Sequence, residues 1–389
     1  MLEESTLSYN SEISMGAKAL SASVCEACGQ ENRREALFCR RCTAPVAVAA
    51  LGEFDADDQR LCLRALFEVL SESTAGRRRS VADDRLWRNY LSAFWLRPET
   101  ALVLYAEALA VRAALSRARG PHLDLGCGDG IHAALRGGWR FTDDFDAFQS
   151  LDPSARDIYN AWNPKDFRAV TVHRARKIDF GVDIKPTAVS RAKALGAFSR
   201  VERADATRLP LKDSSVGSIF SNMLRDLGEP LPAALSECRR VLKDDGVLLI
   251  SAMTPEYPRR LYFAPAALRA EKKGESAMAR RLLRLDRGRS VFCRRQLTAP
   301  QWQTLLRKSG FKLEGVRPLI GSRVIRFWDV GLRPFSLPLL NARRRWDKDG
   351  SLVRIKRMLV GALAHALAPL AAGVLDGKPC MHLIVARKA

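Results

Sequence analysis

Residues 122–130 read His-Leu-Asp-Leu-Gly-Cys-Gly-Asp-Gly, and this stretch decides the fold. The alternating Leu123 and Leu125 predict a short buried strand, and the glycines that follow predict a tight turn. Gly126 and Gly128 allow positive φ and leave room for a ligand. Asp124 stands at the carboxyl end of the strand, where parallel α/β sheets bind ligands. The spacing differs from the dinucleotide fingerprint, and the acidic residue favours a cationic ligand over a pyrophosphate.

Four later stretches extend this pattern along the chain. Residues 180–183 (Phe-Gly-Val-Asp) and 201–205 (Val-Glu-Arg-Ala-Asp) each predict a strand that ends in an acidic residue. Residues 216–222 predict a fourth strand, and residues 247–252 a fifth, buried one. The fifth strand follows a turn at 243–246 (Lys-Asp-Asp-Gly). Strands that alternate with helical segments predict a parallel α/β sheet rather than an isolated strand-to-helix turn.

In this order, the stretches resemble class I S-adenosylmethionine-dependent methyltransferases of the methyltransferase type 11 kind. The resemblance implies a Rossmann-like sheet of seven strands, whose last strand would be Met381–Ala386. A narrower resemblance points to a bacterial subgroup often associated with surface-glycan pathways, and it covers about residues 83–389. It rests on residues 95–99 (Trp-Leu-Arg-Pro-Glu), 157–160 (Asp-Ile-Tyr-Asn), 183–185 (Asp-Ile-Lys) and 221–222 (Ser-Asn).

The resemblance implies one cavity for S-adenosylmethionine. The implied cofactor-binding residues are Asp124, Gly126, Cys127, Gly128, Asp183, Ile184, Asp205, Ala206 and Asn222. In the family, Asp183 would hold the ribose hydroxyls and Asp205 would meet the adenine amino group. Many relatives carry a His or Trp after the fourth strand, but here residues 223–226 read Met-Leu-Arg-Asp. No general base is therefore carried over, and the catalytic residue stays unknown.

Two Cys-x-x-Cys pairs near the N-terminus, Cys25/Cys28 and Cys39/Cys42, predict a zinc ribbon over residues 21–46. Four thiolates leave no open position on the metal, so the zinc would be structural. Chance spacing and redox pairs are the alternatives. We expect the ribbon to lie outside the sheet domain, so that removing the metal leaves cofactor affinity intact.

The remaining chain divides by composition. Residues 1–20 are polar and unpatterned, which predicts a disordered tail. We expect a helical extension over 52–118, the methyltransferase domain over 119–389, and an aromatic-rich inserted lid over 136–178. The C-terminal part, 253–389, is basic: from residue 251 onward there are 29 Lys/Arg against 9 Asp/Glu, out of a net charge of +21 for the whole chain.

This charge favours an anionic partner, although an ordinary solvated basic surface explains it as well. Residues 352–375 are amphipathic and then apolar, which fits either a buried helix pair or a helix lying on a membrane. They cannot cross a bilayer if Met381–Ala386 returns to the sheet. Leu352, Ile355 and Leu359 would enter the lipid beside basic residues such as Lys356. No signal-peptide pattern is seen, so we expect a cytoplasmic protein. We also consider peripheral contact of this protein with the inner membrane.

These observations predict a methyltransferase that moves a methyl group by SN2 displacement to a small or lipid-linked, glycan-type acceptor. One alternative is an RNA methyltransferase that uses the ribbon and the basic C-terminal part. Another is a zinc-ribbon adaptor whose methyltransferase-like domain is catalytically dead.

Overall fold

The computed structural model describes residues 24–28, 30–33, 36–42, 44–71, 81, 84–149, 152, 154, 156, 171–227, 230–293 and 295–389. The predicted tail at 1–20 lies outside the described residues, as do residues 157–170 of the predicted insertion. The subgroup motif at 157–160 falls within that second range.

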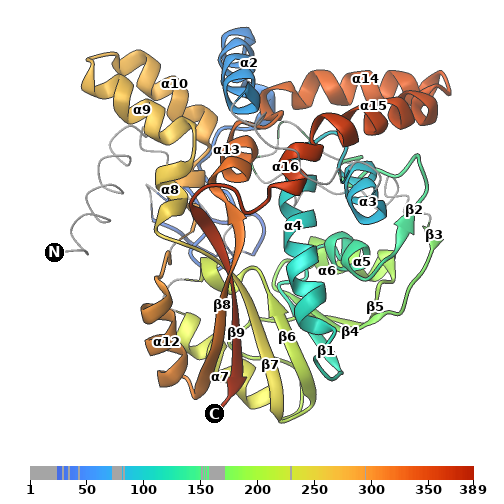
Figure 1. The fold of residues 1–389 in the computed structure, drawn as a ribbon, viewed down its shortest axis with the longest axis vertical. Helices are drawn as coiled ribbons and strands as arrows, with labels where there is room; N and C mark the ends of the chain where they lie inside the picture. The colour runs from blue at the N-terminus through green and yellow to red at the C-terminus, as the bar shows by residue number, and fades with distance from the viewer. Residues whose placement is uncertain are drawn as a thin grey trace.

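Seven strands form the main sheet, in the order β5-β4-β1-β6-β7-β9-β8 (Figure 1). They are β1 His122–Leu125, β4 Ile178–Asp183, β5 Phe198–Arg203, β6 Val216–Ser221, β7 Leu242–Met253, β8 Phe311–Gly321 and β9 Pro379–Lys388. Strands β5, β4, β1, β6 and β7 are parallel, and β9 runs antiparallel between β7 and β8. The predicted Rossmann-like sheet of seven strands is confirmed, including the return of the last strand.

The turn predicted at 243–246 is instead a bulge within β7. Val216 pairs with Leu242, and two residues later Ser218 pairs with Val247. The intervening residues therefore loop out without ending the strand, as in an enlarged β-bulge.

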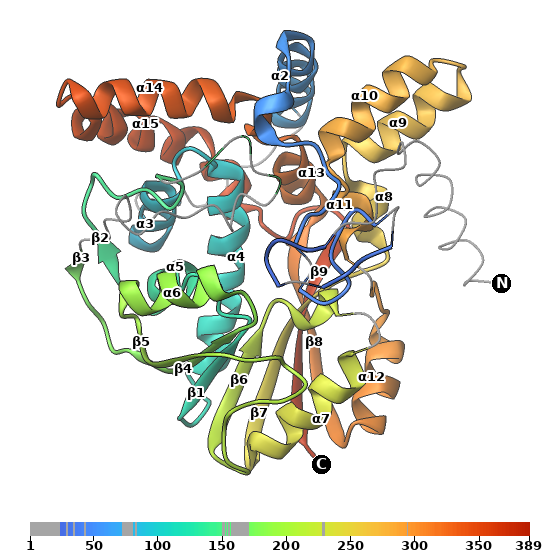
Figure 2. The ribbon, with the colours of Figure 1, turned by 180° about the vertical axis from the view of Figure 1, so that it is seen from behind.

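Helices cover both faces of the sheet (Figure 2). Side chains of β7 alternate between the faces: Leu249 packs with the helices α4 Pro98–Leu115, α5 Ile131–Arg136 and α6 Pro186–Leu195. Leu248 packs with α7 Leu231–Val241 and α12 Ala299–Lys308 on the other face. This two-residue period is what a strand buried on both faces requires.

The predicted helical extension consists of a short 3-10 turn, α2, α3 and α4. Their bounds are η1 Leu51–Glu53, α2 Ala56–Ser71 and α3 Arg85–Ala93, followed by α4. Asp84 caps α3 by accepting a hydrogen bond from the Trp87 backbone N–H, and Pro98 occupies the first turn of α4. Tyr90 and Leu91 of α3 are buried in the same core as the α4 side chains.

Most of the remaining helices gather beyond the carboxyl ends of the parallel strands, at the top of Figure 1. They are α8 Glu256–Arg260, α9 Phe263–Lys272, α10 Ser276–Asp286, α11 Arg289–Phe292, α13 Ser322–Val330, η3 Arg333–Phe335, α14 Ser336–Lys348, α15 Leu352–Ala366 and α16 Ala368–Ala372. A third 3-10 turn, η2 Leu224–Asp226, follows β6 directly.

The described part of the predicted insertion is folded. It contains a two-stranded sheet of β2 Arg140–Phe141 and β3 Thr171–His173. Phe145 and Phe148 are buried, and the Phe148 ring meets the Phe94 ring at a centroid distance of 5.9 Å.

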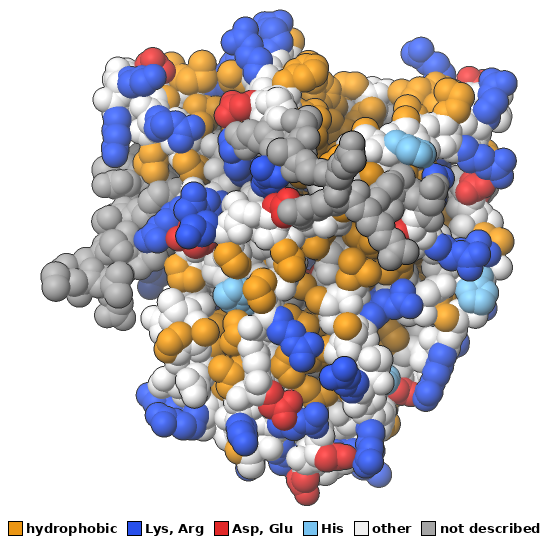
Figure 3. All heavy atoms as spheres, in the orientation of Figure 1, with side chains coloured by type: hydrophobic (Ala, Val, Ile, Leu, Met, Phe, Trp, Pro, Cys, Tyr) orange, Lys and Arg blue, Asp and Glu red, His pale blue; other side chains and the backbone are white. Residues whose placement is uncertain are grey.

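The positive charge of the C-terminal part does not form one patch on the face shown in Figure 3, where Lys and Arg side chains are scattered. Some of these cations are buried. Arg333 is bound to Asp329 in the interior, and Arg343 lies 3.6 Å from Asp146. The number of Lys and Arg residues in the sequence therefore overstates the number of cations on the surface, whereas the net charge is unchanged because each buried pair removes one charge of each sign.

One face of helix α15 is buried against the rest of the protein. The Trp87 indole N–H on α3 donates to the Ala364 carbonyl at 3.4 Å. Leu352 is 3% and Lys356 1% exposed, so the prediction that both face a bilayer is wrong. Among the described residues, no helix is long and apolar enough to span a membrane.

Lys356 makes stability depend on pH. Its ammonium donates to the Phe145 carbonyl, and burial lowers its pKa to about 8, although Asp146 and Asp143 raise it. Between about pH 8 and pH 10.5 the folded state binds fewer protons than the unfolded state, so the free energy of unfolding should rise with pH. Over this pH window, the free energy of unfolding of wild type should rise by about 2–3 kcal/mol more than that of Lys356→Met. Urea denaturation at several pH values measures the free energy of unfolding. The same dependence on pH in both proteins would contradict the prediction.

Candidate functional site

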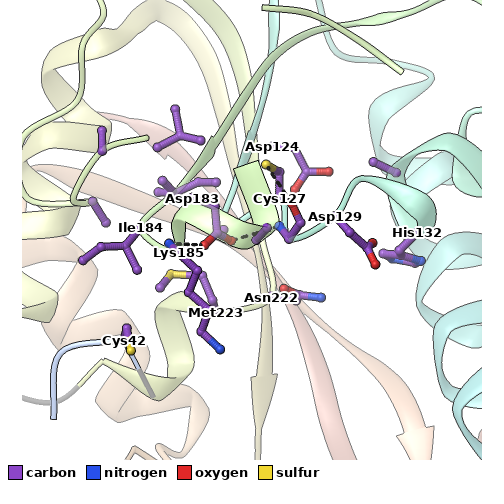
Figure 4. A pocket seen from close by; sticks show the side chains of 18 of the residues that line it. Cys42, Asp124, Cys127, Asp129, His132, Asp183, Ile184, Lys185, Asn222 and Met223 are labelled. Atoms are coloured by element: carbon purple, nitrogen blue, oxygen red, sulfur yellow. Dashed lines mark hydrogen bonds between the residues drawn. The ribbon is translucent and has the colours of Figure 1, made fainter. Parts of the chain in front are cut away.

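A cavity of about 340 Å³ opens at the carboxyl ends of β1, β4, β5 and β6 (Figure 4). Every cofactor-binding residue predicted from the sequence lines it. These are Asp124, Gly126, Cys127, Gly128, Asp183, Ile184, Asp205, Ala206 and Asn222. The topology brings them together because consecutive parallel strands end at the same edge of the sheet.

The glycine turn after β1 adopts the predicted backbone conformation. Gly126, Gly128 and Gly130 have φ of +79°, +58° and +79°. A Cβ at Gly126 would stand 2.1 Å from Met223 Cγ, whereas one at Gly128 would meet no atom within 4 Å. The space at Gly126 is thus filled by Met223 and not kept for a ligand, which corrects the prediction. Gly128 keeps the open approach.

Asp183 ties β4 to this turn. Its Oδ2 accepts from the Gly128 backbone N–H and its Oδ1 from the Lys185 backbone N–H, both at 2.9 Å. Burial raises the pKa of Asp183, although these hydrogen bonds oppose the change. A carboxylate has about four lone-pair sites, so the two hydrogen bonds leave acceptor capacity at the cavity wall.

Asp124 lines the cavity, but its charge is already balanced. Its Oδ2 lies 2.7 Å from Arg136 Nη2, and both side chains are buried. The Arg136 guanidinium also stacks on the Phe220 ring, 4.5 Å from the centroid. We conclude that Asp124 contributes mainly an internal ion pair behind the turn.

Asp205 lies at another wall of the cavity. Its Oδ1 accepts from the Thr207 backbone N–H at 3.0 Å and from Thr207 Oγ1 at 2.9 Å. Its Oδ2 lies 3.3 Å from Nε of Arg41. Burial raises the pKa of Asp205, but the Thr207 and Arg41 hydrogen bonds outweigh it, so the net pKa lies below that of an ordinary aspartate.

A polar network centred on His132, which was not predicted from the sequence, borders the cavity. Its Nε2 lies 3.0 Å from Glu107 Oε1, and its Nδ1 lies 3.0 Å from the Tyr90 hydroxyl. Asn222 Nδ2 donates to the same Glu107 oxygen at 3.3 Å. Burial raises the pKa of Glu107, but His132 and Arg225 outweigh it and lower the pKa to about 2. The only sequence signal was a histidine directly after the glycine turn, because its partners come from α3 and α4.

Other lining residues were not predicted from the sequence either. They are Arg41, Phe94, Thr100, Leu104, Asp129, Ala133, Lys185 and Met223, together with Leu125, Cys42, Val182, Ala188, Ala204 and Leu227. Four lining side chains are carboxylates, whereas Arg41 and Lys185 are the lining Lys and Arg residues. Three of the four carboxylates form ion pairs with arginines: Asp124 with Arg136, Asp129 with Arg191 and Asp205 with Arg41. Asp183, which backbone N–H groups hold, is therefore the lining carboxylate whose charge suits a positively charged ligand.

The predicted ribbon brings its four cysteines together. All four sulfur atoms lie within 4.8 Å of one another, with Cys25–Cys42 at 3.5 Å and Cys28–Cys39 at 3.6 Å. Zinc with thiolates at about 2.3 Å requires sulfur–sulfur edges of about 3.8 Å. The cluster is therefore compatible with a tetrahedral zinc site.

The ribbon does not lie apart from the cavity. Arg41 and Cys42 line the cavity, and Ile184 packs against the core of the ribbon. Figure 4 shows Cys42 and Ile184 on the same side of the pocket. The expectation that the ribbon lies away from the cofactor site is wrong, because its second knuckle forms part of the wall.

Comparison with known proteins gives a partial match. Residues 167–250, from before β4 into β7, match the family described as methyltransferase domain. A malonyl-[acyl-carrier protein] O-methyltransferase of Coxiella burnetii is 39% identical over 66 residues, 17% of this chain and 23% of that protein. A protein of the same name from Halorhodospira halophila is 33% identical over 89 residues, which are 22% of this chain and 30% of that protein. The chain thus spans about a quarter of the length of the curated relatives it matches.

Two solved methyltransferase structures also align with this chain, at low sequence identity. An S-adenosylmethionine-dependent methyltransferase from Mesorhizobium loti aligns with a TM-score of 0.36 at 17% identity, covering 72% of this chain and 97% of that one. A putative methyltransferase from Bacillus halodurans aligns with a TM-score of 0.34 at 16% identity, covering 72% of this chain and 98% of that one.

Proposed function

We propose that this chain, which carries a class I methyltransferase domain, is an S-adenosylmethionine-dependent methyltransferase. One observation carries the proposal: the hydrogen bond from Gly128 to Asp183 joins the glycine turn to the acidic end of β4 at the wall of the cavity. A sulfonium cofactor is positively charged, so the Asp183 carboxylate at the cavity wall suits it better than it suits a phosphate.

The residues present fit the cofactor. When bound, S-adenosylmethionine supplies an activated methyl group. Asp183 has spare acceptor capacity for the ribose hydroxyls, and Asp205 offers Oδ2 to the adenine amino group. Most of the rate then comes from positioning the acceptor in line within a dry site. Both ring nitrogens of His132 are engaged, by Glu107 and Tyr90, so we assign no general base to it.

For the acceptor we propose a small or lipid-linked, glycan-type molecule. The lining residues Phe94, Leu104 and Leu227 are apolar, and the Asp183 carboxylate would repel a phosphate backbone. RNA therefore ranks second. A carboxylate on a carrier protein, the acceptor in the names of the two relatives, is the competing candidate.

Two measurements test the proposal. Calorimetry should show binding of S-adenosylmethionine and S-adenosylhomocysteine, but not of NAD. Incubation with methyl-labelled cofactor and fractionated extract should label the lipid or small-molecule fraction. Label in RNA or carrier protein would move the acceptor to those classes. Cofactor binding without transfer to any fraction would favour the dead adaptor, and no binding at all would reject the function.

We also propose that the ribbon holds one structural zinc ion. Four sulfurs within 4.8 Å of one another support it, and among the described residues the buried core of the ribbon consists of Cys25, Ala27, Cys39, Cys42, Ala44 and Val46. So small a core requires a metal to fold. Elemental analysis should find one zinc per chain, and none in Cys39→Ser. A zinc-free wild type purified without chelator would contradict this.

Cytoplasmic location and peripheral membrane contact stay predictions. Exposed Arg354 and Met358 on α15 support the contact, since they combine a cation with an apolar side chain. Flotation with anionic vesicles at low and high salt tests it, with Met358→Asp as the variant.

A further inference from the structure

We propose that the zinc ribbon completes the cofactor site through Arg41, a positioning residue that holds Asp205 in place for the adenine end of the cofactor. The inference rests on the proposed function and deepens it. It makes metal occupancy of the ribbon and cofactor affinity interdependent.

The first step is the position of Arg41 within the ribbon. Arg41 stands between two of the cysteines, Cys39 and Cys42, and its backbone N–H donates to Cys39 Sγ at 3.4 Å. Cys39 is held in turn by its N–H bond to the Ala44 carbonyl at 2.8 Å. The geometry of the metal knuckle therefore fixes the backbone from which the Arg41 side chain extends.

The second step is the contact with the sheet domain. Arg41 Nε lies 3.3 Å from Asp205 Oδ2, across 164 positions of sequence. The side chains are 47% and 32% exposed, so the ion pair alone adds little to folding stability. Its consequence is local: it orients a carboxylate at the cavity wall.

The third step is the hydrogen-bonding capacity of Asp205. Oδ1 accepts two hydrogen bonds from Thr207, which uses both of its lone pairs. Oδ2 accepts one from Arg41 and keeps one lone pair. An adenine amino group can occupy that position while Arg41 stays bound. Arg41 and the amino group therefore share one oxygen and do not compete for it.

The fourth step is the packing of the ribbon beside this pair. Ile184, which follows Asp183 and lines the cavity, packs against the ribbon core that contains Cys42. Loss of the metal would release both Arg41 and this apolar contact. By linkage, cofactor binding must then tighten zinc by the same factor by which zinc tightens the cofactor.

The test is calorimetry with S-adenosylhomocysteine on the full chain and three variants. Arg41→Ala should weaken binding about 3- to 10-fold, as expected for a partly exposed charge-assisted contact. Arg41→Lys should recover part of the loss. Arg40→Ala is the matched control, since Arg40 is in the same knuckle, carries the same charge and is exposed but does not line the cavity. It should bind like wild type, and all three variants should keep one zinc.

Two further arms separate positioning from general effects. With an analogue whose purine lacks the amino group, Arg41→Ala should cost less than with the adenine compound. Zinc-free wild type should bind at least 10-fold more weakly, and the cofactor should slow zinc capture by a chelator. Unchanged affinity in both Arg41→Ala and zinc-free protein overturns the inference, as does tighter binding by Arg41→Ala. No binding by wild type would instead reject the proposed function.

Discussion

Replacing Asp183 by alanine is expected to lower the affinity for S-adenosylmethionine by at least about 100-fold. Asp183 is the acceptor expected for two ribose hydroxyls, and hydrogen bonds to a charged group contribute about 1.5–3 kcal/mol each. The variant also loses the hydrogen bond to Gly128 that joins the turn to β4. Calorimetry with wild type and variant measures the change directly.

Asp179→Asn is the matched control, because Asp179 lies on the same strand and also accepts a backbone hydrogen bond, from His122 at 2.8 Å. It does not line the cofactor cavity. We expect both variants to lose some stability, but only the Asp183 variant to lose cofactor affinity. Equal affinity for all three proteins would remove Asp183 from the site.

Replacing Gly126 by alanine is expected to destabilise the fold by about 3 kcal/mol. A residue with a Cβ at φ +79° costs about 1–2 kcal/mol. The added Cβ would also stand 2.1 Å from Met223 Cγ, and overpacking of this kind costs about 1–3 kcal/mol. Because Met223 lines the cavity, its displacement should also weaken cofactor binding. Urea denaturation gives the free energy of unfolding.

Gly128→Ala separates the two causes. It meets the same backbone penalty, at φ +58°, but a Cβ there has no neighbour within 4 Å. We expect it to cost about 1 kcal/mol, and Gly126→Ala combined with Met223→Ala to recover part of the loss of the single variant. If Gly126→Ala and Gly128→Ala destabilise equally, the contact with Met223 has no energetic role.

Local patterns predicted the cofactor residues because each one lies at the carboxyl end of a strand or shortly after it. Asp183 and Asp205 come directly after alternating or apolar runs, and parallel strands bring such ends to one edge. The ribbon cysteines were predictable for a similar reason, since two short loops supply all four sulfurs. In neither case does the prediction require knowing how distant helices pack.

The His132 network required the tertiary structure. Its members lie on α3, α4, α5 and the end of β6, and nothing in their own segments distinguishes them from ordinary buried polar residues. The burial of Lys356 is of the same kind. An amphipathic pattern predicts a surface for a lysine, but the Phe145 carbonyl and Asp146 satisfy its charge inside the protein.

The sequence by itself determined the parallel strands, the glycine turn, the acidic strand ends and the four-cysteine cluster, because each depends on neighbouring residues or on a fixed short spacing. The number of seven strands came from the resemblance to class I methyltransferases. Only the tertiary structure decided that the ribbon forms a wall of the cavity. In that contact Arg41 forms an ion pair with Asp205, and Ile184 packs against the ribbon core that contains Cys42. Docking depends on shape and charge matching between surfaces far apart in the chain, and no local periodicity records it.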